Sequence, residues 1–324
     1  MLADGTAITG VELKKLSDDE LRSRVGKIIL FARTDPIQKL RIVEALRANG
    51  EVIAMTGDGV NDSPALKSAD IGIVVKDASD ISKEVADMVL LDSNFGTIVR
   101  AVEEGRAMFD NIKKTVMYLL IGSFSELILV MGAILLQLPL PITALQILWV
   151  NLVEDALPAL SLAFEPKEGD LLKQPPRSKN EHILDRQMLK IIALFVLIAD
   201  AMIFLIFYYL HRESVSVELM RTVVFVGVGI NSLFYIFACK SLRHTIFSYN
   251  PFSNRFMVLS VLIGIGALIV GVQMPIFNLV LGTVPLSLGY WTSLFGLGLL
   301  NLLLFEVIKV WVNRGNRSTE MQLR

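Results

Sequence analysis

One stretch decides the fold: Met55-Thr56-Gly57-Asp58-Gly59-Val60-Asn61-Asp62-Ser63-Pro64-Ala65-Leu66. It overlaps a mostly apolar run, residues 51–56, which predicts a short strand covered on both faces. Pro64 suits the first turn of a helix, for which Asp62 or Ser63 would be the N-cap. The loop between them is therefore expected at the carboxyl end of a parallel strand, where open α/β sheets bind their ligands.

The loop has the residues that a Mg²⁺ ion and a phosphoryl group require. Gly57 and Gly59 let the backbone turn sharply and approach a ligand closely. Asp58 and Asp62 offer hard carboxylate oxygens, which suit Mg²⁺. An Asp- and Gly-rich turn that merely links strand and helix would explain any two of these residues, but it would not explain the whole string.

The residues around this loop predict half of a doubly wound α/β domain. The apolar run Ile28–Ala32 predicts a buried strand. Asp35 and Pro36 begin a helix that ends at residues 49–50. Residues 71–75 and 88–91 predict two further strands. We therefore expect an α/β unit over residues 1–94.

The composition of the 324-residue chain changes along its length. Charged residues fill roughly the first 114 positions and then give way to long apolar runs. Overall, 53% of the residues are hydrophobic and the mean hydropathy is positive, which is unusual for a soluble protein. A net charge of −1 gives no reason to expect a nucleic-acid partner. The single cysteine, Cys239, excludes an internal disulfide.

Six apolar runs predict a multi-pass protein of the cell membrane, with the lipid bilayer as a partner. They cover residues 115–136, 142–163, 189–210, 220–239, 255–274 and 289–311, each near the roughly 20 residues that cross about 30 Å of hydrocarbon. Residues 95–114 would form a helical stalk that Asn94 caps, residues 164–188 a loop, and residues 312–324 a tail. Basic residues collect in that loop, in the turn 240–254 and in the tail, which places both termini in the cytoplasm.

Ionisable residues inside the first hairpin of spans, residues 115–163, predict a cation site. Glu126 lies in the middle of the first span, and Asn151, Glu154 and Asp155 share one face of the second through their i, i+3 and i+4 spacing. A buried carboxylate costs several kcal/mol unless it is paired or bound to a cation. Pro158 cannot bond the carbonyl of Glu154, so this turn can open and offer carbonyl ligands. The alternative is a carboxylate that is simply hydrogen-bonded to a neighbouring helix.

Three segments resemble a known family. Residues 56–66, Thr-Gly-Asp-Gly-Val-Asn-Asp-Ser-Pro-Ala-Leu, resemble the hinge motif of the P-type cation-transporting ATPases of the haloacid dehalogenase superfamily. Phe31-Ala32-Arg33-x-x-Pro36-x-x-Lys39 resembles their conserved lysine segment, and 149–159 resembles the sixth span of calcium pumps. The resemblance implies the α/β half of a haloacid-dehalogenase-like (Rossmannoid) phosphorylation domain, followed by an all-α six-span transmembrane bundle with four C-terminal helices over 189–311.

The resemblance also implies cofactors and residue roles. ATP would be the substrate, and Mg²⁺ the cofactor, with Asp58 as its ligand, Asp62 supporting that geometry and Lys39 opposing the phosphoryl charge. Phosphate or nucleotide would lie near Arg33, Lys39, Gly57 and Asn61. The transported cation, with Ca²⁺ as the first expectation, would be bound by Ser123, Glu126, Asn151, Glu154 and Asp155.

Several features depart from the complete two-site calcium pumps. Ser123 stands where they have Asn, Glu154 where they have Thr, and Phe225 where the eighth span carries Glu, which predicts one divalent ion per cycle rather than two. The family's nucleophile motif, Asp-Lys-Thr-Gly-Thr, does not occur. The actuator domain, the nucleotide-binding domain and the first four spans do not occur either. We therefore expect the C-terminal part of a pump, which needs that N-terminal part and hydrolyses no ATP alone.

Other functions stay open. A Na⁺ or H⁺ pump could use the same acidic residues, and a truncated, non-catalytic membrane module would need a partner that carries the nucleophile. A dehalogenase-like phosphatase fused to membrane helices would need its own nucleophilic Asp upstream of Asp58. Asp200, inside the third apolar run, has no assigned role. Gly264, Gly266 and Gly271 are expected to permit close contact between helices.

Overall fold

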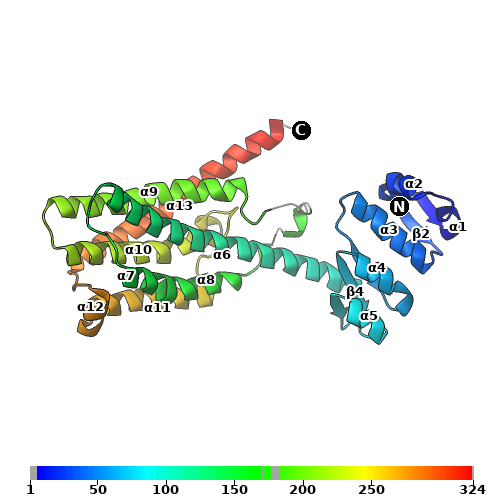
Figure 1. Cartoon of the computed structure of the whole chain (residues 1–324), viewed down its shortest axis with the longest axis horizontal. Helices are drawn as coiled ribbons and strands as arrows, with labels where there is room; N and C mark the ends of the chain where they lie inside the picture. The colour runs from blue at the N-terminus through cyan, green and yellow to red at the C-terminus, as the bar shows by residue number, and fades with distance from the viewer. Residues whose placement is uncertain (1–5, 93, 170, 175, 177–181, 323–324) are drawn as a thin grey trace. The chain divides into compact units, whose positions relative to one another are not determined.

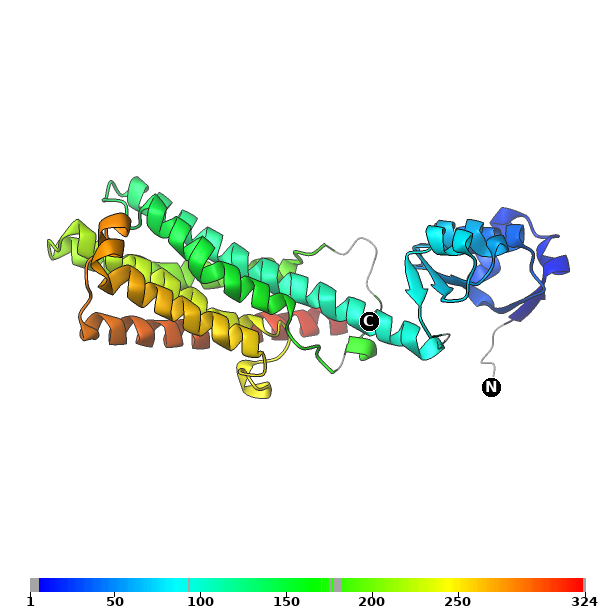
Figure 2. The same ribbon diagram turned by 90° about the horizontal axis from the view of Figure 1, so that it is seen from below.

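The computed structural model describes residues 6–92, 94–169, 171–174, 176 and 182–322. They divide into two compact units, with the boundary in the main chain between Glu103 and Glu104. Figures 1 and 2 show that the first unit holds the strands and short helices and the second holds the long helices. The expected α/β part and helical part are therefore both present.

The first unit contains two small parallel sheets. The first pairs β1 (Thr6–Thr9) with β2 (Ile28–Ala32), and the second has the order β3-β4-β5, formed by Ala54–Gly57, Ile71–Val75 and Met88–Leu90. The helices are α1 (Gly10–Leu13), α2 (Asp18–Arg24), α3 (Pro36–Ala48), α4 (Ser63–Ser68) and α5 (Asp80–Val85). The expected strands at 28–32, 71–75 and 88–91 are confirmed, and so is the helix that Asp35 caps.

The expectation of strands covered on both faces is wrong for β2 and β3. Ile29 and Leu30 of β2 are 57% and 51% exposed, and β3 begins only at Ala54 and alternates between exposed and half-buried residues. Within the described residues, β2 pairs with β1 alone and β3 with β4 alone. Successive side chains of a strand point to opposite faces of its sheet, so the exposure of both Ile29 and Leu30 means that the described helices leave part of each face of β2 uncovered.

Three elements at the start of the first unit did not follow from apolar periodicity. They are β1, α1 and α2, and both helices begin with a reciprocal capping box, Thr9 with Glu12 and Ser17 with Glu20. Each glutamate accepts hydrogen bonds from the backbone N–H and the hydroxyl of its cap residue, which lowers the pKa of both carboxyls. The Ser/Thr-x-x-Glu spacing was the available signal for these helices.

The second unit is a helical bundle, and the described residues form six helices long and apolar enough to span a membrane, as predicted. They are α6 (Phe95–Leu135), the broken second span Ala144–Ala163, α9 (Arg186–Arg212), α10 (Val217–Cys239), α11 (Arg255–Gln273) and α13 (Leu288–Gln322). The predicted stalk and first span form the single helix α6, and Asn94 Oδ1 accepts the Gly96 N–H at its start, 2.8 Å away. The link after α11 contains an unpredicted short helix, α12 (Pro275–Leu281).

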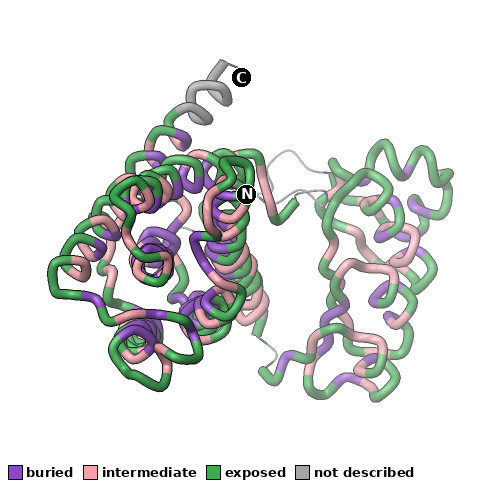
Figure 3. The backbone as a smooth tube through the Cα atoms, turned by 60° about the vertical axis from the view of Figure 1, so that its left-hand side comes forward, coloured by how far each residue is buried: buried purple, intermediate pink, exposed green. Residues whose placement is uncertain are grey.

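Helix α10 is the centre of this bundle. Of its most apolar window, 89% is buried, against 33–44% for the other five candidate spans. Figure 3 colours the backbone by burial, and the core cluster includes residues of every span. A helix that is apolar and buried all round has neighbours on all of its sides, so α10 sets the packing of the others.

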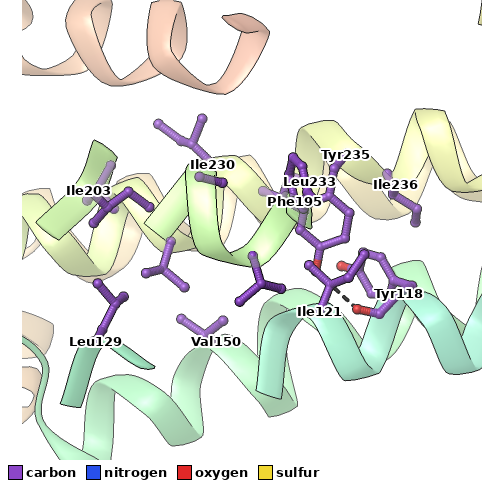
Figure 4. Close-up of a cluster of buried hydrophobic side chains, with 14 of the residues drawn as sticks. Tyr118, Ile121, Leu129, Val150, Phe195, Ile203, Ile230, Leu233, Tyr235 and Ile236 are labelled. Atoms are coloured by element: carbon purple, nitrogen blue, oxygen red, sulfur yellow. Dashed lines mark hydrogen bonds between the residues drawn. The ribbon is translucent and has the colours of Figure 1, made fainter. Parts of the chain in front are cut away.

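Four aromatic side chains from four helices form one layer of the core, which we call the aromatic layer. Tyr235 of α10 lies 5.3 Å from Tyr118 of α6 and 5.5 Å from Phe195 of α9, measured between ring centroids. Phe305 of α13 lies 4.9 Å from Phe195. Figure 4 shows Tyr118, Phe195 and Tyr235 gathered at one level of the bundle. The two contacts of Phe195 are edge-to-face and that of Tyr118 with Tyr235 is tilted, and together these ring contacts hold α6, α9, α10 and α13 in register at this level.

One end of the bundle is closed by a polar network, which we call the collar. Asn111 of α6 donates to the Glu165 carbonyl oxygen (2.8 Å), and Lys240 and Asn254 both bind the Glu165 carboxylate. The remaining members are Arg106, which donates to the carbonyls of Leu171 and Gln174, and the ion pair of Lys114 with Glu168. Burial lowers the pKa of Lys240, and the Glu165 carboxylate opposes that change. The collar thus joins α6 to the two loops that follow the second span and α10.

Glycines of α11 differ in what they contact. A Cβ atom at Gly264 would lie 2.6 Å from the Leu233 side chain of α10, and one at Gly271 would lie 3.2 Å from Leu281. A Cβ atom at Gly266 would meet no atom of the described residues within 4 Å. The expected close helix contact is therefore present at Gly264 and Gly271, and the expectation is wrong for Gly266.

We expect the substitution Gly264→Val to destabilise the bundle by about 1–3 kcal/mol, because overpacking forces α10 and α11 apart. Gly266→Val is the matched control on the same helix and should unfold close to the wild type. All three tryptophans lie in the second unit, so thermal unfolding in detergent can be followed by their fluorescence. Equal melting temperatures for the two variants would contradict the packing described for α10 and α11.

Candidate functional site

The loop after β3 meets the lysine of α3, as the sequence predicts. Lys39 Nζ donates to Asp62 Oδ1 over 2.6 Å, and Asp62 is buried at the start of α4. The two side chains line a cleft of about 390 Å³ together with Thr56, Gly57 and Asp58. The ammonium and the carboxylates of the expected phosphate site therefore share one cleft at the carboxyl end of β3.

Gly57 is required by the fold of this loop. A Cβ atom there would lie 2.6 Å from the Cβ of Asp62 and 2.9 Å from its Oδ2, too close for any side chain. Gly59 has open space around it instead. The absence of a side chain at Gly57 thus lets Asp62 turn back towards Lys39.

The other predicted residues of this site are exposed. Asp58 and Asn61 project from the loop, and Arg33 follows β2 in a left-handed conformation with φ 53°. Mg²⁺ is commonly held by one or two carboxylates with waters and substrate phosphates, so the accessible Asp58 fits such an ion. Across the described residues, no group of three or more His, Cys, Asp and Glu side chains could hold a metal by itself.

The second span is broken where the sequence places its acidic residues. An α-helix, α7 (Ala144–Trp149), is followed by a π-helical segment, Val150–Asp155, and then by α8 (Ala156–Ala163). Pro158 lies in the first turn of α8 and cannot donate to the Glu154 carbonyl. The predicted opening of this turn is therefore present, and π-helical segments of this kind are frequent at functional sites.

Two predicted ligands bind each other at the edge of the bundle. Asn151 donates to Glu126 Oε1 over 2.6 Å and to the carbonyl of Ile147 over 3.0 Å. Glu126 is half-buried and Asn151 is exposed. Ser123, one turn earlier on α6, is exposed as well. These three residues lie on an open face of the second unit.

Asp155 is the buried carboxylate of the site. It is 3% exposed and accepts the hydroxyl of Tyr118, 2.7 Å away. Tyr235 of α10 donates to the backbone oxygen of Tyr118 (3.1 Å), so the aromatic layer holds this tyrosine in place. Gly122 leaves room for the carboxylate, because a Cβ there would lie 3.3 Å from Asp155 Oδ2. The tyrosine was missed as a site residue, although a polar aromatic in an apolar run was a signal for it.

Glu154 does not share the face of Asn151 and Asp155. It is fully buried, and no described group hydrogen-bonds to either of its carboxylate oxygens. Its Oε2 lies against Gly229 of α10, where a Cβ atom would come within 2.1 Å. The π-helical segment winds more widely than an α-helix, so the i+3 residue turns away from the face expected of it. Phe225 of α10 is also fully buried.

The chain is similar to known proteins over almost its entire length. Residues 139–311 match a family described as cation transporting ATPase, C-terminus, and residues 7–70 match haloacid dehalogenase-like hydrolases. It is 38% identical to a calcium-transporting ATPase of Bacillus subtilis, over 90% of this chain and 33% of that protein. A human calcium-transporting ATPase type 2C member 2 is 38% identical over 94% of this chain and 32% of its own length.

A third relative, a probable cation-transporting ATPase F of Mycobacterium tuberculosis, is 37% identical over 90% of this chain and 32% of its own length. The chain thus spans about a third of the length of the curated relatives it matches. The hinge loop, the broken second span and the six long helices agree with these matches, and the first family match alone covers more than half of the chain. The chain therefore belongs to the P-type cation-transporting ATPases and corresponds to their C-terminal part.

Proposed function

We propose that this chain supplies the cation path and part of the phosphorylation site of an ATP-driven calcium pump with an aspartyl-phosphate intermediate. The observation that carries the proposal is the buried Asp155, which is hydrogen-bonded to Tyr118 inside a bundle of span-length helices. An ionisable group at such a place is by default part of an ion path. The printed names of the relatives favour Ca²⁺ as the cargo over Na⁺ or H⁺.

At the loop, the side chains would act on the phosphoryl group and its metal. When bound, Mg²⁺ would neutralise part of the negative charge on the phosphate groups. Asp58 would hold it, since this carboxylate is accessible in the cleft. Lys39, oriented by Asp62, would set its ammonium against the negative phosphoryl oxygens. The exposed Asn61 and Arg33 would contact phosphate or nucleotide.

In the membrane, Asp155 would provide the fixed negative charge and Tyr118 would keep the carboxylate in one orientation. Glu126 and Asn151 would exchange their mutual hydrogen bond for contacts with Ca²⁺, and Ser123 would add a hydroxyl. Glu154 faces α10 and Phe225 offers no oxygen, so we propose a single Ca²⁺ per cycle.

The partner would be the part of the pump that carries the nucleophilic aspartate, the actuator and nucleotide-binding domains and the first four spans. In the assembled pump, this partner would cover the exposed Ile29 and Leu30 of β2. Its four spans would pack against the open face that carries Ser123 and Asn151. Lys167, Lys173 and Arg243 favour cytoplasmic termini by the positive-inside rule. Arg177 and Lys179, which contributed to that expectation, lie outside the described residues.

The isolated chain should form no phosphoenzyme, because the Asp-Lys-Thr-Gly-Thr nucleophile does not occur in it. The measurement is incorporation of label from γ-labelled ATP with Mg²⁺ into the purified, membrane-reconstituted chain. A pump that contains this sequence together with the nucleophile is the positive control. Acid-stable label on the isolated chain would overturn this part of the proposal.

Gly57→Ala should reduce phosphoenzyme formation in the intact pump by at least about tenfold, because the new methyl group displaces Asp62 from Lys39. Gly59→Ala is the matched control two residues away, and it should stay within about twofold of the wild type, since its Cβ enters open space. If both variants lose activity equally, the loss reflects general disturbance of the loop and the assigned geometry is wrong.

Asp155→Asn should weaken Ca²⁺ activation of the ATPase by at least about tenfold, since it removes the charge that would balance the ion. Asp19→Asn, an exposed aspartate of the first unit, is the control and should leave the activation curve unchanged. Ca²⁺-dependent ATPase activity and uptake of labelled Ca²⁺ into vesicles are the measurements. Unchanged activation in Asp155→Asn would refute the cation site, and two Ca²⁺ per ATP would refute its single occupancy.

A further inference from the structure

A cavity of about 530 Å³ lies beside the collar and belongs to neither of the sites described so far. Its walls come from residues 165–169 and 173, which follow the second span, and from residues between 240 and 253, in the loop that joins α10 to α11. Figure 2 shows both loops at one end of the bundle. We call this cavity the loop pocket. Its volume is typical of pockets that bind small ligands.

The two acidic side chains that line the loop pocket already have partners. The Glu165 carboxylate lies 3.2 Å from Lys240 Nζ, and the Glu168 carboxylate lies 3.2 Å from Lys114 Nζ. Both lysines are buried, each with 2% exposure. The second carboxylate oxygen of Glu168 is enclosed by the protein. Each acidic group is therefore neutralised by a buried lysine, and neither leaves a net negative charge in the pocket that would repel an anion.

The rim of the loop pocket carries additional positive charge. Lys167 and Lys173 line the pocket and are both exposed. Lys167 pairs with Glu104 over 2.8 Å, but an exposed ion pair of this kind contributes little and can be exchanged for another anion. Among the described residues, no acidic group pairs with Lys173. His244, whose side chain is 49% exposed, adds a third nitrogen group to the rim. The rim thus has an excess of groups that bind anions.

Exposed aromatic side chains on the same two loops indicate how deep the loop pocket lies in a membrane. Phe247 and Phe252, between α10 and α11, are 80% and 64% exposed. Phe164, after the second span, and Phe256, at the start of α11, are 65% and 69% exposed, and their ring centroids are 6.0 Å apart. Aromatic side chains at the ends of spans lie at the level of the lipid headgroups. The loop pocket is therefore expected at the depth of the lipid phosphates.

A phosphate group matches this arrangement. It is a compact anion with several acceptor oxygens, so Lys167, Lys173 and His244 can donate to it together. Basic pockets beside transmembrane helices bind phosphorylated headgroups by the same chemistry. A metal cation does not match the loop pocket, because the carboxylates of Glu165 and Glu168 already bind lysines. The charge of the pocket is therefore complementary to a phosphate anion.

We propose that the loop pocket binds an anionic phosphate group, with Lys167, Lys173 and His244 as its donors. The phosphate belongs to the headgroup of an anionic membrane lipid or to a soluble phosphate ester, and the exposed aromatic side chains at this level favour the lipid. A phosphate bound here joins the two loops, both of which contact α6. The site shares no residue with the one around Asp155, so the proposal holds whichever cation the pump moves.

The test uses the whole chain in neutral detergent, as wild type, as the double variant Lys167→Gln with Lys173→Gln, and as the control Lys190→Gln, an exposed lysine of α9 outside the pocket. The lipid arm measures binding of labelled phosphatidylglycerol in excess phosphatidylcholine. The soluble arm measures binding of labelled inorganic phosphate and glycerol 3-phosphate. We expect saturable binding in one arm, weakened at least about tenfold in the double variant and within about twofold of the wild type in Lys190→Gln.

The arm in which the double variant loses binding identifies the source of the phosphate. Three results overturn the proposal: no saturable binding in either arm, binding that the double variant retains, and equal loss in the double variant and Lys190→Gln, which would reflect overall charge. Both substituted lysines are exposed, so the double variant should melt at the wild-type temperature without added ligand. Tryptophan fluorescence checks this, so that loss of binding is not mistaken for loss of fold.

Discussion

The structure of the bundle depends on how it satisfies polar atoms that have no access to water. In an apolar interior each such atom must find a partner, and the hydrogen bond from Tyr118 to Asp155 is the clearest case. It requires α6 and the second span to be close, and Tyr235 of α10 in turn fixes the tyrosine. The central helix and the aromatic layer both contact this tyrosine through Tyr235, and the broken second span carries the carboxylate. Glu154 is an exception, because no described group hydrogen-bonds to its carboxylate oxygens.

Features with local causes could be predicted from the sequence. Asp35 and Pro36 predict the start of α3, because they are a capping residue and a residue favoured in the first helical turn. Six long apolar runs predict the spans. The meeting of Lys39 with the Gly57 loop was expected only from the resemblance to the family, because a lysine on an amphipathic helix is by itself usually solvated. Burial of the strands was not predictable, since it depends on which elements pack on the two faces of each sheet, and Ile29 and Leu30 are left exposed.

The candidate cation site in the helical bundle likewise has some features that could be predicted from the sequence and others that could not. Polar residues in an apolar run stand out, which made Glu126, Asn151 and Asp155 candidate ligands. An α-helical period put Glu154 on the wrong face, because the π-helical segment was not predicted from the sequence. Tyr118 carries no charge and merges into its apolar run. Its importance depends on a contact between helices that are separate in the sequence, its hydrogen bond to Asp155 of the second span.

The collar has a consequence for the order in which the protein is made. Asn111 of α6 is synthesised 54 residues before its hydrogen-bond partner, the carbonyl of Glu165. The carboxylate of Glu165 is in turn synthesised 89 residues before Asn254, which donates to it. A ribosome therefore synthesises and inserts the early helices before the groups that hold them exist. The collar is therefore complete only after Asn254, the residue before α11, has left the ribosome.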